Sequence, residues 1–342
     1  MDITRFPRRH YTHGITPIEK LDRFSRALGS DSPTIYIKRD DQLGLTGHGN
    51  KTRKLEFLVA DALAQGADTL ITCGGVQSNH CRLTLAAAVR EGLRCRLVLA
   101  ESTPGTYRPE DGGNVLLYHL LGVEKIITVP WGTDLSAALQ QAAADASVEG
   151  SKPYIIPLGG SNPLGVLGYI ACAEEIVAHH LNIHHIVLPV GSAGTLAGLL
   201  LGLRGHGRSL PVTGMSVLHP RVRAEATAMS LVQATAAFLG IETPVSRKDV
   251  VCLDDYLGEG YTLPTDGMIE AVRLLARTEG ILLDPTYTGK AVAGLIDLTR
   301  QGHFKKGQNV LFLHTGGTPG LYARPEIFSR RKAGSSHPPA HP

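Results

Sequence analysis

The sequence lacks several features that would assign it to a special class of protein. No apolar run reaches the ~18 residues that a membrane-spanning helix needs, because Gly, Arg, His or Asp interrupts each one. The basic start of the chain is followed by no apolar segment, so we expect no export signal. The five cysteines fit neither a CxxC pair nor a zinc spacing, which predicts buried, reduced thiols. We therefore expect a cytoplasmic protein without a membrane or metal partner.

The chain also lacks a strong excess of one charge. Its 34 Lys and Arg against 31 Asp and Glu give a net charge of +3, and the basic residues are scattered apart from Arg330–Lys332. This weak, dispersed charge argues against a nucleic-acid partner. The composition, 43% hydrophobic and 19% charged, is that of an ordinary globular protein, and 342 residues are enough for two lobes.

Short segments rich in Val, Ile and Leu alternate with amphipathic helical segments along the chain. The predicted strands are 34–38, 68–72, 94–100, 125–130, 153–157, 185–190, 212–217, 249–253, 281–284 and 309–314. Continuous apolar strands between helices are typical of parallel sheets covered on both faces. The pattern predicts an α/β fold with two open, twisted, mainly parallel sheets flanked by helices, and a ligand beyond the carboxyl ends of the strands. The Pro-, Ser- and His-rich residues 329–342 are expected to be disordered.

A glycine-rich loop follows one predicted strand and precedes an apolar helix. It consists of Gly191, Ser192, Ala193, Gly194 and Thr195. Small residues leave backbone N–H groups accessible and the helix N-terminus adds positive charge, so the loop can bind a phosphate. It lacks the GK[ST] ending of a Walker loop, and the third glycine of a dinucleotide fingerprint is misplaced. A tight turn without a ligand is the alternative.

Three cations, Lys51, Arg53 and Lys54, begin another predicted helix, where the helix dipole disfavours positive charge. One explanation is an anion bound at this position. Another is that one lysine is required in its neutral form, because the dipole and neighbouring cations lower a lysine pKa and favour the amine that forms a Schiff base. A solvated basic turn is the third.

A polar turn, Gln77, Ser78, Asn79 and His80, lies between a predicted strand and a helix. Backbone N–H groups and side-chain donors together can bind a carboxylate there. Alternatively, Ser78 or Asn79 simply caps the helix. Two further Gly-bearing turns, 284–291 and 314–319, follow strand ends.

In this order the motifs resemble the pyridoxal-phosphate enzymes of the tryptophan-synthase-β fold, PLP fold type II. The similar branch contains D-cysteine desulfhydrase and aminocyclopropane-carboxylate deaminase. The resemblance extends over nearly the whole chain, through RFPR (5–8), YIKRDD (36–41), GNKTRKLEF, QSNH, GSAGT, LLDPTYTGKA and LFLHTGG. It implies pyridoxal 5'-phosphate as cofactor, a small amino-acid substrate and a homodimer.

The resemblance also implies which residues would hold the cofactor. Lys51 matches the lysine that binds it as a Schiff base and moves the α-proton, with Lys54 and Lys290 as weaker candidates. The loop 191–195 matches the phosphate-binding loop. Asn50 and Asn79 lie beside the cofactor in this branch. Thr315 matches the hydroxyl residue near the pyridine nitrogen.

The substrate side of the site is implied by the same comparison. Ser78, with Gln77 and Asn79, matches the turn that holds the substrate carboxylate. Tyr261 and Tyr287 match two tyrosines that face the substrate, and either is a candidate for protonating the leaving group. The catalytic set implied is therefore Lys51, Ser78, Tyr261 and Tyr287.

Thr288 departs from the deaminase pattern, in which a glutamate at this position keeps the pyridine nitrogen charged. A ring without that charge is a shallower electron sink, adequate when a good β-leaving group departs after α-deprotonation. Thr288 thus favours α,β-elimination, D-cysteine giving pyruvate, sulfide and ammonia. An L-cysteate sulfo-lyase releasing sulfite is the alternative, and the deaminase is less favoured. His48 and Thr262 depart from both patterns and leave the substrate open.

We expect a large cofactor-binding domain of residues 1–47 and 160–328 and a small domain of residues 48–159. Two other classes of function stay open but are less favoured. A nicotinamide-dependent oxidoreductase would need the dinucleotide fingerprint that is missing here. A non-catalytic binding protein would have no need of Lys51. The histidine pairs at 179–180 and 184–185 predict a solvated turn rather than a metal site.

Overall fold

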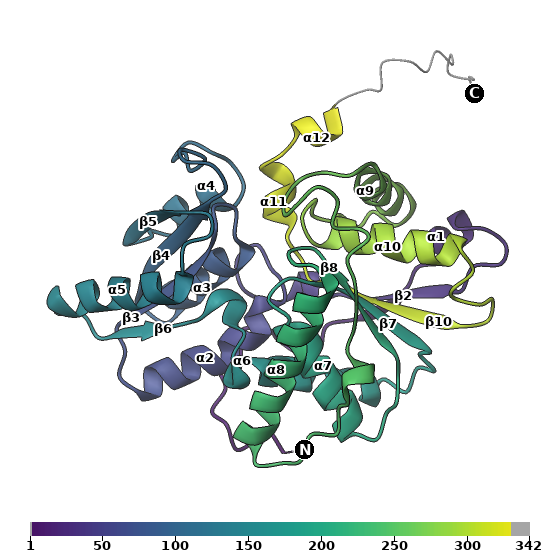
Figure 1. Cartoon of the computed structure of the whole chain (residues 1–342), viewed down its shortest axis with the longest axis horizontal. Helices are drawn as coiled ribbons and strands as arrows, with labels where there is room; N and C mark the ends of the chain where they lie inside the picture. Colours follow the sequence, from purple (N-terminus) through teal and green to yellow (C-terminus); the bar gives the residue numbers. More distant parts are fainter. Residues whose placement is uncertain (1, 330–342) are drawn as a thin grey trace.

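The computed structural model describes residues 2–329, so the predicted disordered tail lies, apart from its first residue, outside the described residues. Within the described part, ten strands form two sheets (Figure 1). The larger sheet has the order β1-β2-β10-β7-β8-β9 and the smaller one β5-β4-β3-β6. Every strand pair is parallel except the edge pair β1 and β2. The predicted α/β fold with two mainly parallel sheets is confirmed.

The strands of the larger sheet are β1 (Ile18–Lys20), β2 (Thr34–Lys38), β7 (His185–Val190), β8 (Val212–Ser216), β9 (Val251–Leu253) and β10 (Asn309–Leu313). Those of the smaller sheet are β3 (Thr69–Gly75), β4 (Arg94–Glu101), β5 (Lys125–Pro130) and β6 (Pro153–Ile155). The helices are α1 (Asp22–Ala27), α2 (Lys51–Ala64), α3 (Asn79–Arg90), α4 (Asn114–Leu120), α5 (Leu135–Val148), α6 (Pro163–Ala178), α7 (Gly194–Gly205), α8 (Arg221–Leu239), α9 (Asp266–Glu279), α10 (Thr288–Arg300), α11 (Thr318–Tyr322) and α12 (Glu326–Ser329).

Both faces of the larger sheet are buried by helices. In β7, Ile186 and Leu188 point into a core shared with α6, α7 and α8, whereas Val187 points into the opposite core, shared with α1, α9 and α10. This alternation follows from the period of two in a strand. The smaller sheet packs α2, α3 and α4 on one face and α5 on the other. The continuous apolar strands in the sequence thus correctly predicted sheets that are covered by helices on both faces.

Helix α2 connects the two halves of the molecule. It packs against α6, where a Cβ added at Gly168 would come within 2.3 Å of the Arg53 carbonyl oxygen, so this close approach requires glycine. The Arg53 guanidinium forms buried ion pairs with Asp40 and Glu175. The strands of the smaller sheet all lie within residues 48–159. The domain boundaries themselves stay a prediction.

Two local predictions differ from the structure. Residues 281–284 form no strand, because the Asp284 carboxylate accepts hydrogen bonds from the backbone N–H groups of Thr286, Tyr287 and Thr288 and so starts α10. Strand β1 was not predicted, since it has three residues and only one neighbour.

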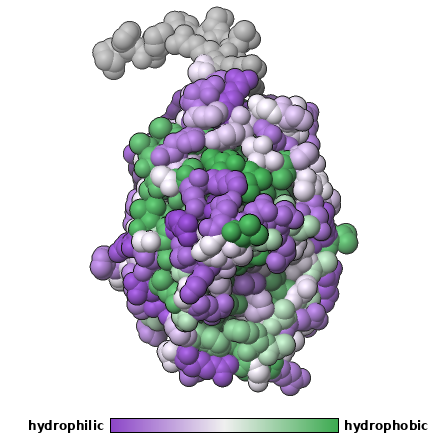
Figure 2. Space-filling model, turned by 90° about the vertical axis from the view of Figure 1, so that its left-hand side faces the viewer, coloured by the Kyte–Doolittle hydropathy of each residue, from purple (hydrophilic) through white to green (hydrophobic). Residues whose placement is uncertain are grey.

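Two further findings concern burial and surface. The five cysteines are buried and unpaired, which confirms the expected thiols. Among the described helices, none has the length and apolarity to cross a membrane. On the face at the side of the smaller sheet, hydrophilic and hydrophobic side chains are interspersed (Figure 2).

Candidate active site

A cavity lies between the two sheets, beyond the carboxyl ends of β3, β7 and β10. It encloses about 930 Å³, part of it open to solvent. Most of the predicted site residues line it: Asn50, Lys51, Ser78, Asn79, Gly191, Ser192, Ala193, Thr195, Tyr261, Tyr287 and Thr315. Gln77 and Gly194 do not. The fold thus brings together segments that are more than 250 residues apart in the sequence.

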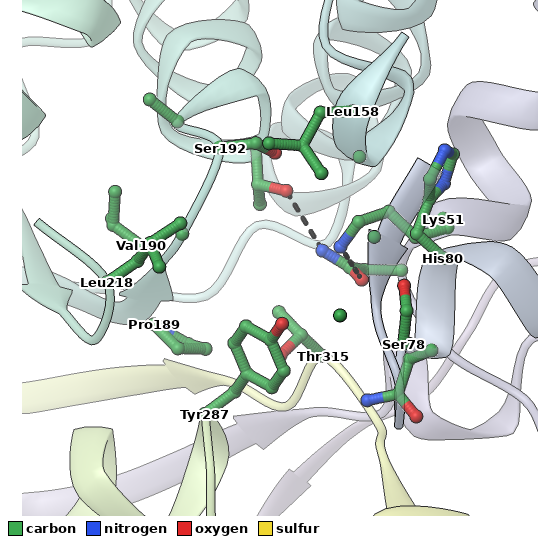
Figure 3. Close-up of a pocket in the computed structure, with 18 of the residues that line it drawn as sticks. Lys51, Ser78, His80, Leu158, Pro189, Val190, Ser192, Leu218, Tyr287 and Thr315 are labelled. Atoms are coloured by element: carbon green, nitrogen blue, oxygen red, sulfur yellow. Dashed lines mark hydrogen bonds between the residues drawn. The ribbon is translucent and has the colours of Figure 1, made fainter. Parts of the chain in front are cut away.

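Lys51 is the first residue of α2, and its side chain points into the cavity (Figure 3). Its Nζ donates to Asn50 Oδ1 at 2.9 Å, and Asn50 Nδ2 donates to Thr195 Oγ1 at 3.0 Å, which links the lysine to the glycine-rich loop. Burial lowers the pKa of Lys51 to about 8; the Asp284 carboxylate opposes this shift and the Arg82 charge adds to it. At pH 7 about one tenth of the amine is therefore free base, far more than for a lysine with an ordinary pKa.

The glycine-rich loop connects β7 to α7. Ala193, the N-cap of α7, has a left-handed backbone with φ 62°, a conformation that is costly for a residue with a side chain. A Cβ added at Gly194 would lie 2.5 Å from Ser161 Oγ and 2.7 Å from Lys54 Nζ, so a larger residue there would displace these two side chains. The Ser192 hydroxyl hydrogen-bonds that of Ser161 at 2.7 Å.

Lys54 is a site residue whose position the sequence did not reveal. Its side chain is buried beside the loop, and its Nζ donates to the Gly159 carbonyl oxygen at 3.1 Å and to Ser161 Oγ at 2.9 Å. No ion pair to Lys54 forms within the described residues, and burial holds its pKa well below the usual value. The sequence feature that could have indicated this position is the spacing of three residues between Lys51 and Lys54, which places both lysines on one face of α2.

In the polar turn, Ser78 serves as the N-cap of α3. Its Oγ accepts a hydrogen bond from the Cys81 N–H at 3.2 Å, so the capping alternative is correct for this residue. Ser78 and Asn79 nonetheless line the cavity. Gln77 turns away, since its amide pairs with the Gly112 carbonyl oxygen at 3.0 Å and the Asn114 N–H at 2.8 Å. A contact of the Gln77 side chain with substrate therefore stays a prediction that this conformation does not favour.

Two tyrosines form another wall of the cavity, and the Tyr287 ring lies beside Gly191, where an added Cβ would come within 3.4 Å of it. The hydroxyls of Tyr261 and Tyr287 share a short hydrogen bond. Burial raises the pKa of Tyr261 to about 12 and that of Tyr287 well above its usual value, so both phenols are protonated near neutral pH. Thr262, the β-branched residue after Tyr261, has φ 67°, an outlier that fixes the path of this segment.

Trp131, which the sequence did not single out, stacks on Tyr261 with ring centroids 5.8 Å apart and an interplanar angle of 21°. It lies between β5 and α5, lines the cavity and is half-exposed. It is the only tryptophan in the chain. The mouth of the cavity therefore has an aromatic edge from the smaller sheet.

Thr288 and Lys290 both point away from the cavity. Thr288 Oγ1 donates to Asp284 Oδ1 at 2.7 Å and accepts from the Asp284 N–H at 2.8 Å. Lys290 Nζ donates to the carbonyl oxygens of Leu257 and Gly260 at 2.7 and 2.8 Å. Among the described residues that line the cavity, none is Asp or Glu.

These features fit pyridoxal phosphate. The amine of Lys51 is available for a Schiff base, and the loop and Lys54 together offer hydrogen-bond donors and small residues where a phosphate fits. The fold and the site together define an enzyme of the PLP fold type II class.

Comparison with known proteins agrees. The model of the family described as pyridoxal-phosphate dependent enzyme matches residues 10–316, and the chain belongs to this family. A crystal structure of an ACC deaminase homologue is 37% identical, with a TM-score of 0.86, and the match covers 95% of this chain and 96% of that one. This likeness is consistent with the deaminase and D-cysteine desulfhydrase branch.

Two structures of O-ureido-L-serine synthase share the fold at 20% identity and a TM-score of 0.64. One is the synthase itself, with coverage of 93% and 94% of the two chains. The other is a mutant bound to O-ureido-L-serine, with coverage of 94% of each. The pyridoxal-phosphate cofactor and the fold type implied by the sequence motifs are thus confirmed at the level of the family.

Proposed function

We propose that the enzyme is a carbon–sulfur lyase that eliminates the β-substituent of a cysteine-like amino acid. The leading substrate is D-cysteine, which with one water gives pyruvate, sulfide and ammonia. The observation that carries this proposal is that the cavity lining contains no Asp or Glu among the described residues. A lining without carboxylates supports a pyridine nitrogen that is not kept charged, and an elimination needs less electron withdrawal than opening a cyclopropane ring.

The residues around the cofactor have distinct roles in this proposal. Bound pyridoxal phosphate supplies the electron sink for the carbanion at Cα. Lys51 holds the cofactor and, once its amine is free, takes the α-proton, for which a pKa of about 8 is well matched. The loop 191–195 and Lys54 would bind the phosphate, Asn50 and Asn79 would lie beside the cofactor, and Thr315 would be the hydroxyl residue near the pyridine nitrogen.

The substrate is oriented by the turn of Ser78 and Asn79, which binds its carboxylate. The proton for the leaving sulfur comes from Tyr287 or Tyr261. Both phenols are protonated near neutral pH, and their shared hydrogen bond allows one to replace the proton that the other donates. Thiol and sulfonate leaving groups both fit this scheme, so an L-cysteate sulfo-lyase is the second candidate.

The test supplies D-cysteine, L-cysteine, L-cysteate, D-serine and aminocyclopropane carboxylate side by side to the purified holoenzyme. Sulfide, sulfite, pyruvate and 2-oxobutyrate are assayed separately. We expect sulfide and pyruvate from D-cysteine. Sulfite from L-cysteate as the dominant product would favour the second candidate. Release of 2-oxobutyrate from the cyclopropane would contradict the elimination proposal.

We also propose that the enzyme is a cytoplasmic homodimer. The dimer rests on the resemblance to the branch, and the buried, unpaired cysteines fit a reducing compartment. Light scattering coupled to gel filtration measures the mass of the assembly. A monomer at micromolar concentration would contradict the dimer.

A further inference from the structure

Arg82, on helix α3, is a fully buried cation that the proposed function leaves unused. Its guanidinium donates to Asn114 Oδ1 at 2.7 Å, to the carbonyl oxygen of Thr46, and to that of His48 at 3.1 Å. In the described part of the chain it forms no ion pair with a carboxylate, whereas the equally buried Arg53 pairs with two. Because an uncompensated buried charge is unfavourable, a role for this charge is to be expected.

The two backbone carbonyl groups, of Thr46 and His48, belong to the segment that leads into Asn50 and Lys51. Gly47, His48 and Gly49 all have positive φ, of 73°, 56° and 130°. Histidine is strained in this conformation, so the segment needs support from outside itself. Arg82 provides that support by binding the carbonyl groups on both sides of Gly47.

The other partners of Arg82 belong to the polar turn. Asn114 Nδ2 donates to Asn79 Oδ1 at 3.0 Å and to the Gln77 carbonyl oxygen at 2.9 Å, and Arg82 Nη2 lies 3.5 Å from Asn79 Oδ1. Asn79 lines the cavity, while Arg82 lies behind it. Arg82 therefore joins the segment that presents the lysine to the turn that is proposed to bind the substrate carboxylate.

We propose that Arg82 is a positioning residue: it ties the segment before Lys51 to the polar turn, and its positive charge, which no ion pair balances within the described residues, disfavours a second positive charge on the amine of Lys51 until the substrate carboxylate offsets it. The part that concerns the carboxylate rests on the proposed function; the part that concerns Lys51 does not.

The charges around Lys51 support this role. Lys54 on α2, His80 and Arg82 on α3, and Asp284 before α10 act on the lysine. Burial lowers the pKa values of Lys54 and His80 well below their usual values, so neither brings a firm positive charge. The two tyrosines of the cavity are neutral near pH 7. Arg82, whose pKa of about 10 keeps it protonated, is thus the lasting positive charge that opposes Asp284.

The experiment compares wild type with Arg82→Met, which removes charge and donors, and Arg82→Lys, which keeps the charge but loses the planar fork. Arg90→Met on the same helix is the matched control, since Arg90 is exposed and outside the site. Each apoprotein is mixed with pyridoxal phosphate across pH, capture is followed by visible absorbance, and borohydride reduction with peptide mapping verifies Lys51. Circular dichroism checks the fold.

Loss of the charge raises the pKa of Lys51. The pH midpoint of capture should therefore rise by roughly 0.5 to 1 unit in Arg82→Met and stay near wild type in Arg82→Lys and Arg90→Met. In the holoenzyme, Arg82→Met should raise the KM of the amino acid about tenfold or more, while Arg82→Lys mainly lowers kcat.

A folded Arg82→Met protein with the wild-type midpoint would overturn the proposal. If Arg82→Met does not fold, Arg82→Lys decides: a midpoint at the wild-type value supports the role of the charge, and a raised midpoint overturns it. The capture assay needs no turnover. A failure of the lyase proposal would therefore appear in the substrate panel and leave the result for Lys51 readable.

Discussion

Two walls of the cavity differ in the kind of groups that form them. The loop wall consists of Gly159, residues 191–193 and Thr195, with Gly194, Ser161 and Lys54 directly behind them, and is made of backbone, small hydroxyls and one buried lysine. The tyrosine wall, Tyr261, Tyr287 and Trp131, is made of large side chains from three separate segments. Small residues and backbone N–H groups suit a phosphate, whereas the phenols and the indole can make specific contacts with the proposed substrate. We therefore expect substitutions in the loop wall to change cofactor binding, and substitutions in the tyrosine wall to change the reaction of the substrate.

The largest effect is expected at Lys51, which lies between the two walls. Lys51→Ala should lower turnover about 10³-fold or more and abolish the visible band of the bound cofactor, since one amine carries both functions. Lys290→Met is the control, because this lysine is bound to two carbonyl groups away from the cavity and should keep the band. Absorbance and a keto-acid assay give both readings. A Lys51→Ala protein that retains either property would contradict the assignment.

The next effect tests the tyrosine wall. Tyr287→Phe should lower kcat about 10²-fold and leave the Kd of the cofactor nearly unchanged, because it removes a proton donor and no contact of the loop wall. The pKa of Tyr261, about 12, implies that this phenol causes no alkaline loss of activity below about pH 11. Steady-state kinetics measured across pH give kcat and its pH dependence, and titration with the cofactor gives its Kd. Equal changes in kcat and cofactor Kd would show that the walls are not independent.

A smaller effect is expected at Lys54 in the loop wall. Lys54→Met should weaken cofactor binding about tenfold while kcat at saturation changes little, since a charge-assisted hydrogen bond to phosphate is lost. Only protonated Lys54 attracts an anion, and burial lowers its pKa, so phosphate affinity should fall as the pH rises. Inorganic phosphate should raise the unfolding midpoint of wild-type apoprotein more than that of the variant. An equal rise in both would remove Lys54 from the phosphate site.

The sequence predicted the local features of the site better than the contacts between distant segments, for a physical reason. The cations at the start of α2 and the small residues of 191–195 are local features, and each departs from a local preference of the sequence. The direction of the Gln77 amide depends instead on Gly112 and Asn114, which lie 35 and 37 residues further along the chain. Contacts of this kind follow from packing, and no period or motif in one segment contains them.

Trp131 is the clearest example of a residue that only the fold reveals, and it offers the mildest test of the comparison. Its ring covers Tyr261 at the cavity mouth and is half-exposed, so Trp131→Phe keeps an aromatic face and should change kcat/KM only about two- to fivefold. As the only tryptophan, it reports on its own surroundings. Cofactor uptake by wild-type apoprotein should quench its fluorescence, because bound pyridoxal phosphate absorbs at tryptophan emission wavelengths. Substrate should then change the residual emission, if the tyrosine wall is the one that responds to substrate. If the emission responds to the cofactor but to no substrate in the panel, Trp131 senses cofactor binding alone. Such a result would contradict a role of the cavity mouth in substrate selection.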